Sequence, residues 1–268
     1  MSIFYRSVAV RIVSLVGVLL LGAELGAAQV SPLNLSPGYP GNLDDAYPIN
    51  PGAIVAQPSL QVDKQSSNDG RLRMDAVIRW GAARNIELFA GGVFVRGPLF
   101  PGSVNDPRAI QTGLLYRIFH QPDQDSFVPS LAVRSTVQIP YEGPQTRPAL
   151  RNELLASWDL SGGWYAHANF GYQVVPGGQA GLLAPGVNSV WMSRVGVVKG
   201  FRHDVGVMAS VGYGQDPNQS GAYAISPEAG VMWSILPDWI LTMGVGRDFG
   251  SGVNKTTIRA NLGISKVW

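Results

Sequence analysis

The stretch RLRMDAVIRW, residues 71–80, decides the fold class because two kinds of side chain alternate along it without interruption. One set is entirely apolar: Leu72, Met74, Ala76, Ile78 and Trp80. The other set is charged apart from one valine: Arg71, Arg73, Asp75, Val77 and Arg79. A period of two residues is the signature of a β-strand whose two faces meet different environments. The stretch therefore predicts a strand with one face toward lipid or a core and one toward a polar space.

The same alternation recurs from Ile54 to the end of the chain, for example over residues 164–174 and 205–213. We expect about twelve strands of about ten residues each, the length that crosses a bilayer at a tilt. They are predicted to begin near Ile54, Arg71, Ile86, Arg108, Phe127, Arg151, Trp164, Ser189, Val205, Ala222, Trp239 and Lys255.

The predicted connections alternate between short and long. The short ones are residues 81–85, 120–126, 161–163, 200–204 and 236–238, and the longer ones are 97–107, 140–150, 176–188 and 214–221. Outer-membrane barrels have short periplasmic turns and longer external loops. The sequence thus predicts an all-β fold, a single antiparallel transmembrane β-barrel of about twelve strands with that loop arrangement.

Tryptophans mark the predicted strand ends. Six are expected at the periplasmic rim and Trp191 at the outer rim; the six are Trp80, Trp158, Trp164, Trp233, Trp239 and Trp268. Indole rings favour the membrane–water interface, where an apolar ring and an N–H donor are both satisfied. We therefore expect all seven to be membrane-interface aromatics.

The first residues have the layout of a secretory signal peptide. Arg6 and Arg11 precede an apolar run over residues 12–23 and then small residues up to Ala28. We expect a cleaved signal peptide at 1–28, a Pro/Gly-rich periplasmic tail or linker at 29–53 and an outer-membrane barrel at 54–268 of a Gram-negative bacterium. Two interpretations of the tail stay open: it folds back into the periplasmic mouth, or it is a disordered leader. The last strand ends in Trp268 and resembles the closing strand that such barrels present to the outer-membrane assembly machinery.

Composition and motifs exclude several classes. The chain has no cysteine, a formal net charge of +2 and no basic run interleaved with aromatics, so neither thiolate chemistry nor nucleic-acid binding is expected. No catalytic, cofactor-binding or metal motif is present, and the chain is not predicted to be an enzyme or to need a cofactor. His167 is the one histidine on a predicted inner face, and we interpret it as a hydrogen-bonded lumen residue. An enzyme would need a serine or acidic group close to it.

The predicted inner face is rich in arginine. The pore-lining candidates are Arg71, Arg73, Asp75, Arg79, Glu87, Arg117, Arg134, Arg151, Glu153, Asp159, His167, Arg194, Glu228 and Arg259. Two interpretations stay open. The face can form a channel that favours anionic or polarisable solutes, or ion pairs can fill the lumen and hold the wall in shape. A barrel of twelve strands is intermediate in width between one filled by side chains and one with an open channel. The strand count therefore does not decide between the two interpretations.

Several stretches resemble the outer-membrane transporter family of the meta-pathway of phenol degradation. They are IRWGAARNIELFAG, TGLLYRIF followed by PSLAVRSTVQIP, and the glycine/aromatic strands ANFGYQVV and SVGYGQ, within residues 51–268. The resemblance implies uptake of hydrophobic or aromatic compounds.

The hypothesis that follows is an outer-membrane channel or transporter for small molecules, with outer-membrane lipid and a small-molecule solute as partners. The alternatives are a structural or surface-interaction barrel without transport, an outer-membrane enzyme, and a secreted β-sandwich, which also shows period two.

Overall fold

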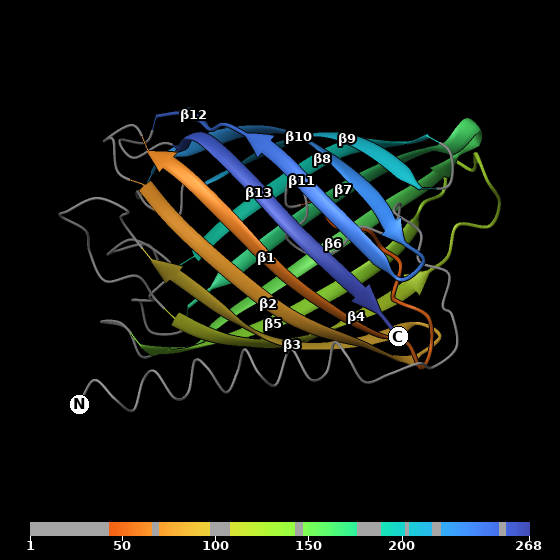
Figure 1. Cartoon of the computed structure of the whole chain (residues 1–268), viewed down its shortest axis with the longest axis horizontal. Helices are drawn as coiled ribbons and strands as arrows, with labels where there is room; N and C mark the ends of the chain where they lie inside the picture. The colour runs from red at the N-terminus through yellow and green to blue at the C-terminus, as the bar shows by residue number, and fades with distance from the viewer. Residues whose placement is uncertain are drawn as a thin grey trace.

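The structure of the chain, a computed structural model, describes residues 43–65, 70–96, 108–142, 147–175, 189–201, 204–215, 221–251 and 256–268. Within these ranges it consists almost entirely of antiparallel strands, wound into the tilted cylinder of Figure 1. The expected signal peptide, the expected tail up to residue 42 and the long loops predicted at 97–107 and 176–188 lie outside the described residues. No helix in the described part is both long and apolar enough to cross a membrane.

Twelve long strands form the wall. They are β1 (Ile54–Gln65), β2 (Gly70–Ala83), β3 (Ile86–Arg96), β4 (Arg108–Phe119), β5 (Ser130–Glu142), β6 (Ala149–Leu160), β7 (Trp164–Val174), β8 (Ser189–Phe201), β9 (Val205–Gln215), β10 (Tyr223–Leu236), β11 (Trp239–Gly246) and β13 (Thr256–Val267). The short strand β12 (Phe249–Gly250) continues β11 along the edge of β10. A single 3-10 turn, η1 (Ser161–Gly163), joins β6 to β7.

The sheet closes on itself, because the first strand pairs with the last. β1 and β13 are antiparallel over a register that runs from Val55 opposite Val267 to Gln65 opposite Thr256. The backbone N–H of Ile54 donates to the carbonyl of Trp268 at 3.1 Å, and the Trp268 N–H donates back at 2.9 Å. Every other long strand pairs with its neighbours in sequence, apart from the contact of β11 with β13. The predicted closed barrel is confirmed, and a two-layered sandwich is excluded.

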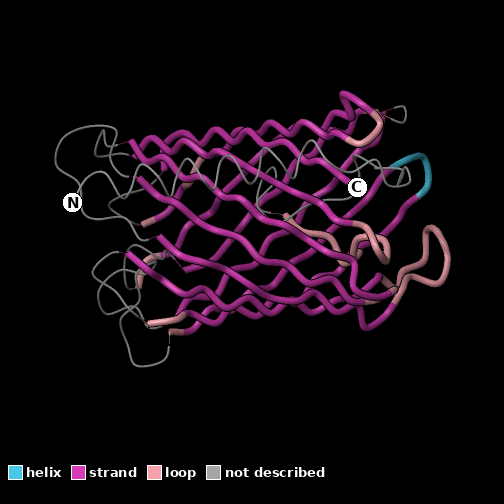
Figure 2. The backbone as a smooth tube through the Cα atoms, turned by 60° about the horizontal axis from the view of Figure 1, so that its bottom comes forward, coloured by secondary structure: helices cyan, strands magenta, loops and turns pink. Residues whose placement is uncertain are grey.

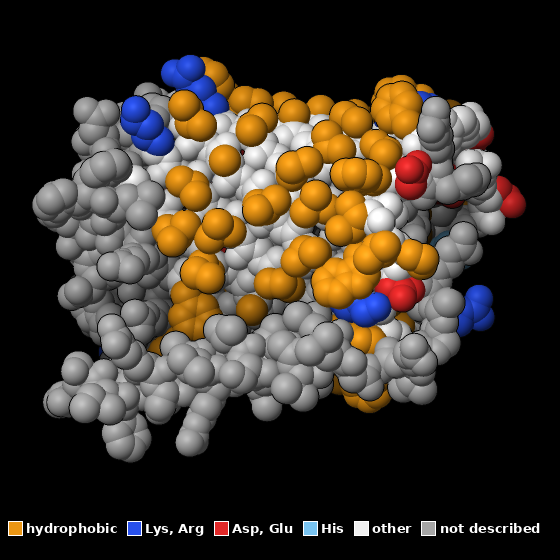
Figure 3. Space-filling model, viewed as in Figure 1, with side chains coloured by type: hydrophobic (Ala, Val, Ile, Leu, Met, Phe, Trp, Pro, Cys, Tyr) orange, Lys and Arg blue, Asp and Glu red, His pale blue; other side chains and the backbone are white. Residues whose placement is uncertain are grey.

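The two faces of each strand meet different surroundings, as the period of two predicts. On β2, Met74 and Ile78 point outward and are 51% and 44% exposed, whereas Arg79 points inward and is 1% exposed. Figure 3 shows the result on one side of the barrel: hydrophobic side chains cover the middle of the wall, and charged side chains gather toward its two ends. This distribution suits a cylinder surrounded by hydrocarbon.

The connection between β4 and β5 is longer than predicted. β5 begins at Ser130 rather than near Phe127, because residues 120–129 fold onto the end of β6. The side chain of Gln121 both donates to the carbonyl of Asp159 and accepts from its N–H, at 2.9 and 2.7 Å. Asp125, in a left-handed conformation with φ of 63°, accepts from the Ser161 N–H at 2.5 Å. These bonds replace the strand pairing that the sequence pattern suggested.

The outward face yields a stability prediction. We expect Leu154→Arg, on the outer face near the middle of β6, to lower the free energy of unfolding by about 2–4 kcal/mol, because the guanidinium would lie near the bilayer midplane. The matched substitution Leu236→Arg, at the exposed end of β10, should cost about 0–1 kcal/mol because the side chain reaches the interface. Denaturant unfolding of both variants in lipid vesicles measures the difference. Equal losses would contradict the assignment of the outer face to lipid.

Candidate functional site

The interior of the barrel is occupied at one end by the residues that precede β1, here called the inner segment (residues 43–53). Leu43, Asp44, Asp45 and Ala46 are all buried, as is Ile49. In Figure 1 this red-orange trace lies at the end of the barrel that carries the C-terminus. Figure 2 shows it as a loop running in among the strands at the same end. The short connections predicted to be periplasmic also lie there.

Apolar side chains on the inner faces of the strands hold the inner segment. Leu43 packs in a cluster with Val198, Met208, Met232 and Ile240. Ala46 packs in a second cluster with inward-facing residues of β4, β5 and β6, namely Leu115, Ala132 and Leu155. The lumen at this depth is therefore a packed core, which stabilises the seated segment by burial of apolar surface.

Two glycines let the inner segment approach the wall closely. A Cβ at Gly196 would lie 2.7 Å from the Cδ2 of Leu43, and a Cβ at Gly81 would collide with the backbone oxygen of Asn50. Gly52 turns the chain into β1 with φ of +84°, and its N–H donates to the Gly81 carbonyl at 2.8 Å. The inner segment thus fits closely against the wall because these two wall positions carry no side chain.

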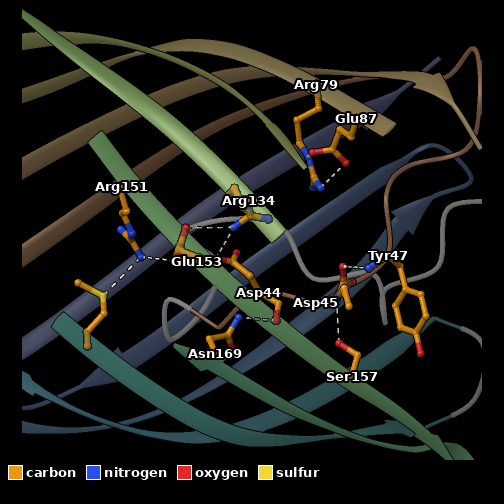
Figure 4. Close-up of polar contacts among 12 residues, drawn as sticks. Asp44, Asp45, Tyr47, Arg79, Glu87, Arg134, Arg151, Glu153, Ser157 and Asn169 are labelled. Carbon is orange, nitrogen blue, oxygen red and sulfur yellow. Dashed lines mark hydrogen bonds and ion pairs between the residues drawn. The ribbon is translucent and has the colours of Figure 1, made fainter. Parts of the chain in front are cut away.

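Polar bonds fix the inner segment at four points, and Figure 4 shows those of Asp44. Asp44 accepts from Arg134 Nη1 at 2.5 Å, and its backbone carbonyl accepts from Asn169 Nδ2 at 3.0 Å. The Ala46 N–H donates to Ser157 Oγ at 2.9 Å. The N–H of Ile49 donates to Glu87 Oε2 at 3.1 Å. Burial raises the pKa of the Asp44 carboxyl, and the guanidinium of Arg134 opposes that rise. The Arg134 guanidinium thus offsets part of the cost of burying this carboxyl group.

The first ion-pair network surrounds the inner segment. Arg79 and Glu87, 1% and 0% exposed, form a fork in which two nitrogens each lie 2.6 Å from a carboxylate oxygen. Glu153 lies 3.8 Å from Arg134 and 2.5 Å from Arg151. A fork such as that of Arg79 and Glu87 is the arrangement that arginine favours in a desolvated site.

A second network, centred on Arg259 of β13, lies farther along the barrel. Arg259 pairs with Asp63 and Asp248, at 3.1 Å each, and with Glu228. Glu228 also pairs with Arg194 at 3.3 Å. The network joins β1, β8, β10 and β13, together with the connection between β11 and β12, across the closing seam of the barrel.

The structure places the predicted inner-face residues inside the cylinder, and it pairs most of the arginines. Beyond the two networks, Arg73 lies 2.8 Å from Asp75, and Arg117 donates to Asn85 at 2.8 Å. Asp159 bonds through its backbone at the rim, and Arg71 is partly buried on the inner face of β2. This geometry favours the interpretation in which ion pairs hold the wall in shape. It disfavours the interpretation in which unpaired arginines face a channel. That these residues line a solute path stays a prediction.

Three carboxylates in these networks are missing from the set predicted from sequence. Asp63 could have been found, because it alternates in phase with Gln57 and Gln61 on the inner face of β1. Asp44 and Asp248 gave no such signal, since one lies in a segment without periodicity and the other at the break between β11 and β12. Together they neutralise arginines that the sequence alone left in excess.

A serine does lie close to His167. Ser157 Oγ is 2.9 Å from His167 Nδ1, and both residues are buried. The hydroxyl is already bonded to the Ala46 N–H, and His167 Nε2 has no hydrogen-bond partner among the described residues. A catalytic triad needs an acid that orients the histidine at its second nitrogen, and the described part of the chain supplies none. No cluster of three metal-ligating side chains occurs among the described residues either.

The tryptophans lie near strand ends. Trp80, Trp164 and Trp233 are each about half exposed on the outer face, Trp158 donates its indole N–H to the Phe127 carbonyl at 3.0 Å, and Trp239 and Trp268 are partly exposed. Trp191 belongs to an outward aromatic cluster with Phe170, Tyr213 and Tyr223. Their role at the membrane interface remains a prediction.

Comparison with known proteins supports the fold. No protein-family model matches the chain. No curated protein matches it in sequence. Among solved structures, the COG4313 outer membrane channel from Pseudomonas putida F1 superposes with a TM-score of 0.62 at 12% identity, over 87% of this chain and all (100%) of that one. The chain shares the fold of this outer-membrane barrel.

Two further structures share the barrel. The KdgM porin gives a TM-score of 0.52 at 10% identity, covering 80% of this chain and 98% of the porin. The CymD monoaromatic hydrocarbon channel gives 0.50 at 9% identity, covering 91% and 99%. These neighbours are porins and channels rather than enzymes, and at such low identity they establish the architecture alone.

The Arg79–Glu87 pair gives a testable expectation. Glu87→Gln leaves the buried Arg79 guanidinium without its countercharge, so the free energy of unfolding should fall by about 3–5 kcal/mol. Asp75→Asn is the matched control, because its partner Arg73 is 40% exposed, and it should cost about 0–1 kcal/mol. Denaturant titration followed by tryptophan fluorescence measures both. If Asp75→Asn lowered the free energy of unfolding as much as Glu87→Gln does, burial of the ion pair would not be the cause of the loss.

Proposed function

We propose that the chain is an outer-membrane channel for small molecules and has no catalytic activity. The observation that carries this proposal is a closed cylinder that is apolar on its outer wall and polar within. In hydrocarbon, such a cylinder provides hydrogen-bond partners for all backbone groups of the wall. Its polar face then surrounds an enclosed path. The solved barrels that share the architecture are porins and channels, which supports the proposal.

The inner segment is the gate of this proposed channel. It fills the lumen at the end with the short connections, and it is held there by buried ion pairs and by packing of Leu43 and Ala46. Passage through the barrel requires displacement or rearrangement of these residues. The proposed resting state is therefore a closed one.

The proposed solutes are hydrophobic or aromatic compounds. Besides ion pairs, the inner face carries apolar side chains such as Phe89, Val93 and Val190, all buried. The sequence resemblance to transporters of phenol degradation points the same way, and one structural neighbour is named as a monoaromatic hydrocarbon channel. An amphipathic lumen of this kind gives an aromatic solute both ring contacts and a polar partner.

The proposal includes the location and partners expected from sequence. These are export by a cleaved signal peptide, residence in the outer membrane of a Gram-negative bacterium, and delivery of the C-terminal strand to the assembly machinery. The pairing of β13 with β1 supports the last point, since this strand completes the cylinder.

The gate can be tested with a tether. Ala46 and Ala132 lie in one buried cluster and the chain has no native cysteine, so Ala46→Cys with Ala132→Cys introduces a unique cross-link. In planar bilayers we expect wild type to give discrete conductance steps, the oxidised double variant to give few or none, and reduction to restore them. A pair on the outer wall, away from the inner segment, controls for the reagents: Ile78→Cys with Ala90→Cys, which lie opposite each other on β2 and β3.

Two outcomes would count against this function. Folded wild type that never conducts, and that passes no solute in liposome swelling, would refute the channel. Equal conductance before and after reduction of a verified cross-link would refute the gate while leaving the channel in place.

A further inference from the structure

The outer wall contains an apolar groove that solute passage does not explain. It has a volume of about 990 Å³ and crosses the strands from Trp158 on β6 to Arg247, just after β11. Outward alanines and valines line it, among them Ala166 and Ala168 of β7, Ala209 of β9 and Ala229 of β10. They alternate with inward-facing, buried residues such as His167 and Ser210, so the groove lies on the lipid side of the wall.

Bulky side chains border the groove on both sides. Two residues farther along the strands toward the end opposite the C-terminus, the register aligns Phe170, Tyr213 and Phe249, which are 50%, 46% and 47% exposed. Toward the end with the C-terminus, Trp164 and Met243 lie two residues beyond the floor of the groove. The difference in side-chain size between floor and borders produces the hollow.

The groove ends at a cation. Arg247 is exposed, and its guanidinium carbon lies 4.8 Å from the centroid of the Phe249 ring. No carboxylate of the described residues pairs with it, in contrast to the arginines of the interior. A guanidinium resting on an aromatic face at the edge of the apolar wall is arranged to receive an anionic group that approaches along the membrane surface.

The length and slope of the groove match an acyl chain. From β6 to β11 it crosses five strand spacings, roughly 24 Å in all. Because strands in such barrels tilt by about 45°, this path descends roughly 17 Å, which is about half of the ~30 Å hydrocarbon core. A chain that starts at Arg247 and follows the groove therefore runs down the wall toward Trp158.

We propose that this groove binds lipid A, the phosphorylated glycolipid of the outer leaflet, with a phosphate on Arg247 and an acyl chain along the alanine floor. The choice of leaflet follows from Arg247 lying at the end opposite the C-terminus and the short turns. The aromatic cluster of Trp191, Tyr213 and Tyr223 lies beside the groove at the level of the head group, where indole and phenol groups favour the interface. The inference rests on the proposed outer-membrane placement but not on solute passage.

The test uses the full chain, purified in mild detergent and titrated with diphosphorylated lipid A under native mass spectrometry. Wild type should bind lipid A at least fivefold more tightly than either phosphate-free lipid A or phosphatidylglycerol. Arg247→Gln should remove most of the preference for the phosphates, whereas Arg84→Gln, an exposed arginine in the turn between β2 and β3, should not. Ala229→Phe should weaken binding of both lipid A forms by filling the floor.

Controls separate misfolding and misplacement from failure of the inference. Ala90→Phe adds the same bulk to the outer face of β3, far around the barrel, and should leave binding unchanged. Heat-modifiable gel mobility verifies that each variant is a folded barrel. A chain absent from the outer-membrane fraction would refute the placement. A correctly placed barrel that shows no preference for lipid A, or the same preference in Arg247→Gln, would refute this inference alone.

Discussion

The structure depends on one constraint: inside a bilayer, every backbone N–H and C=O must find its partner within the protein. An open sheet leaves two unpaired edges, and this chain removes them by pairing β1 with β13 up to the bonds between Ile54 and Trp268. Closure then determines which side chains face the lipid and which face the interior. Since successive residues of a strand point to opposite sides, each strand must give apolar groups to the lipid and its remaining groups to the interior.

The closed barrel also imposes an electrostatic constraint on its interior. Once the inner segment fills one end of the lumen, arginines such as Arg79 and Arg134 are removed from bulk water and need countercharges. Glu87, Glu153 and Asp44 supply them, and Asp44 comes from the inner segment itself. Buried ion pairs of this type define a single arrangement more than they add net stability. The same contacts that hold the segment therefore also fix the shape of the wall around it.

The sequence predicted the barrel well because period two is a local signal that each strand carries in full. The predicted starts of β1, β3, β4, β7, β8, β9 and β11 coincide with the observed ones. The start of β5 was wrong, since the bonds of Gln121 and Asp125 to the end of β6 join residues far apart in sequence. The burial of residues 43–49 had no local signal at all: a proline- and glycine-rich stretch looks the same inside a lumen as in solvent. The charge balance of the interior could not be predicted for the same reason, because Asp44 belongs to this stretch.

The position of the inner segment in the chain sets the order in which the barrel can mature. Its partners lie on strands synthesised much later: Arg134 is 90 residues and Asn169 is 125 residues away from Asp44. Contacts of such large sequence separation form late, because the intervening chain must be ordered before they repay the entropy of loop closure. The first described part of the molecule therefore reaches its place only after the strands that hold its partners are ordered. Arg134, which depends on this segment for one of its countercharges, is therefore removed from water only when the segment is seated.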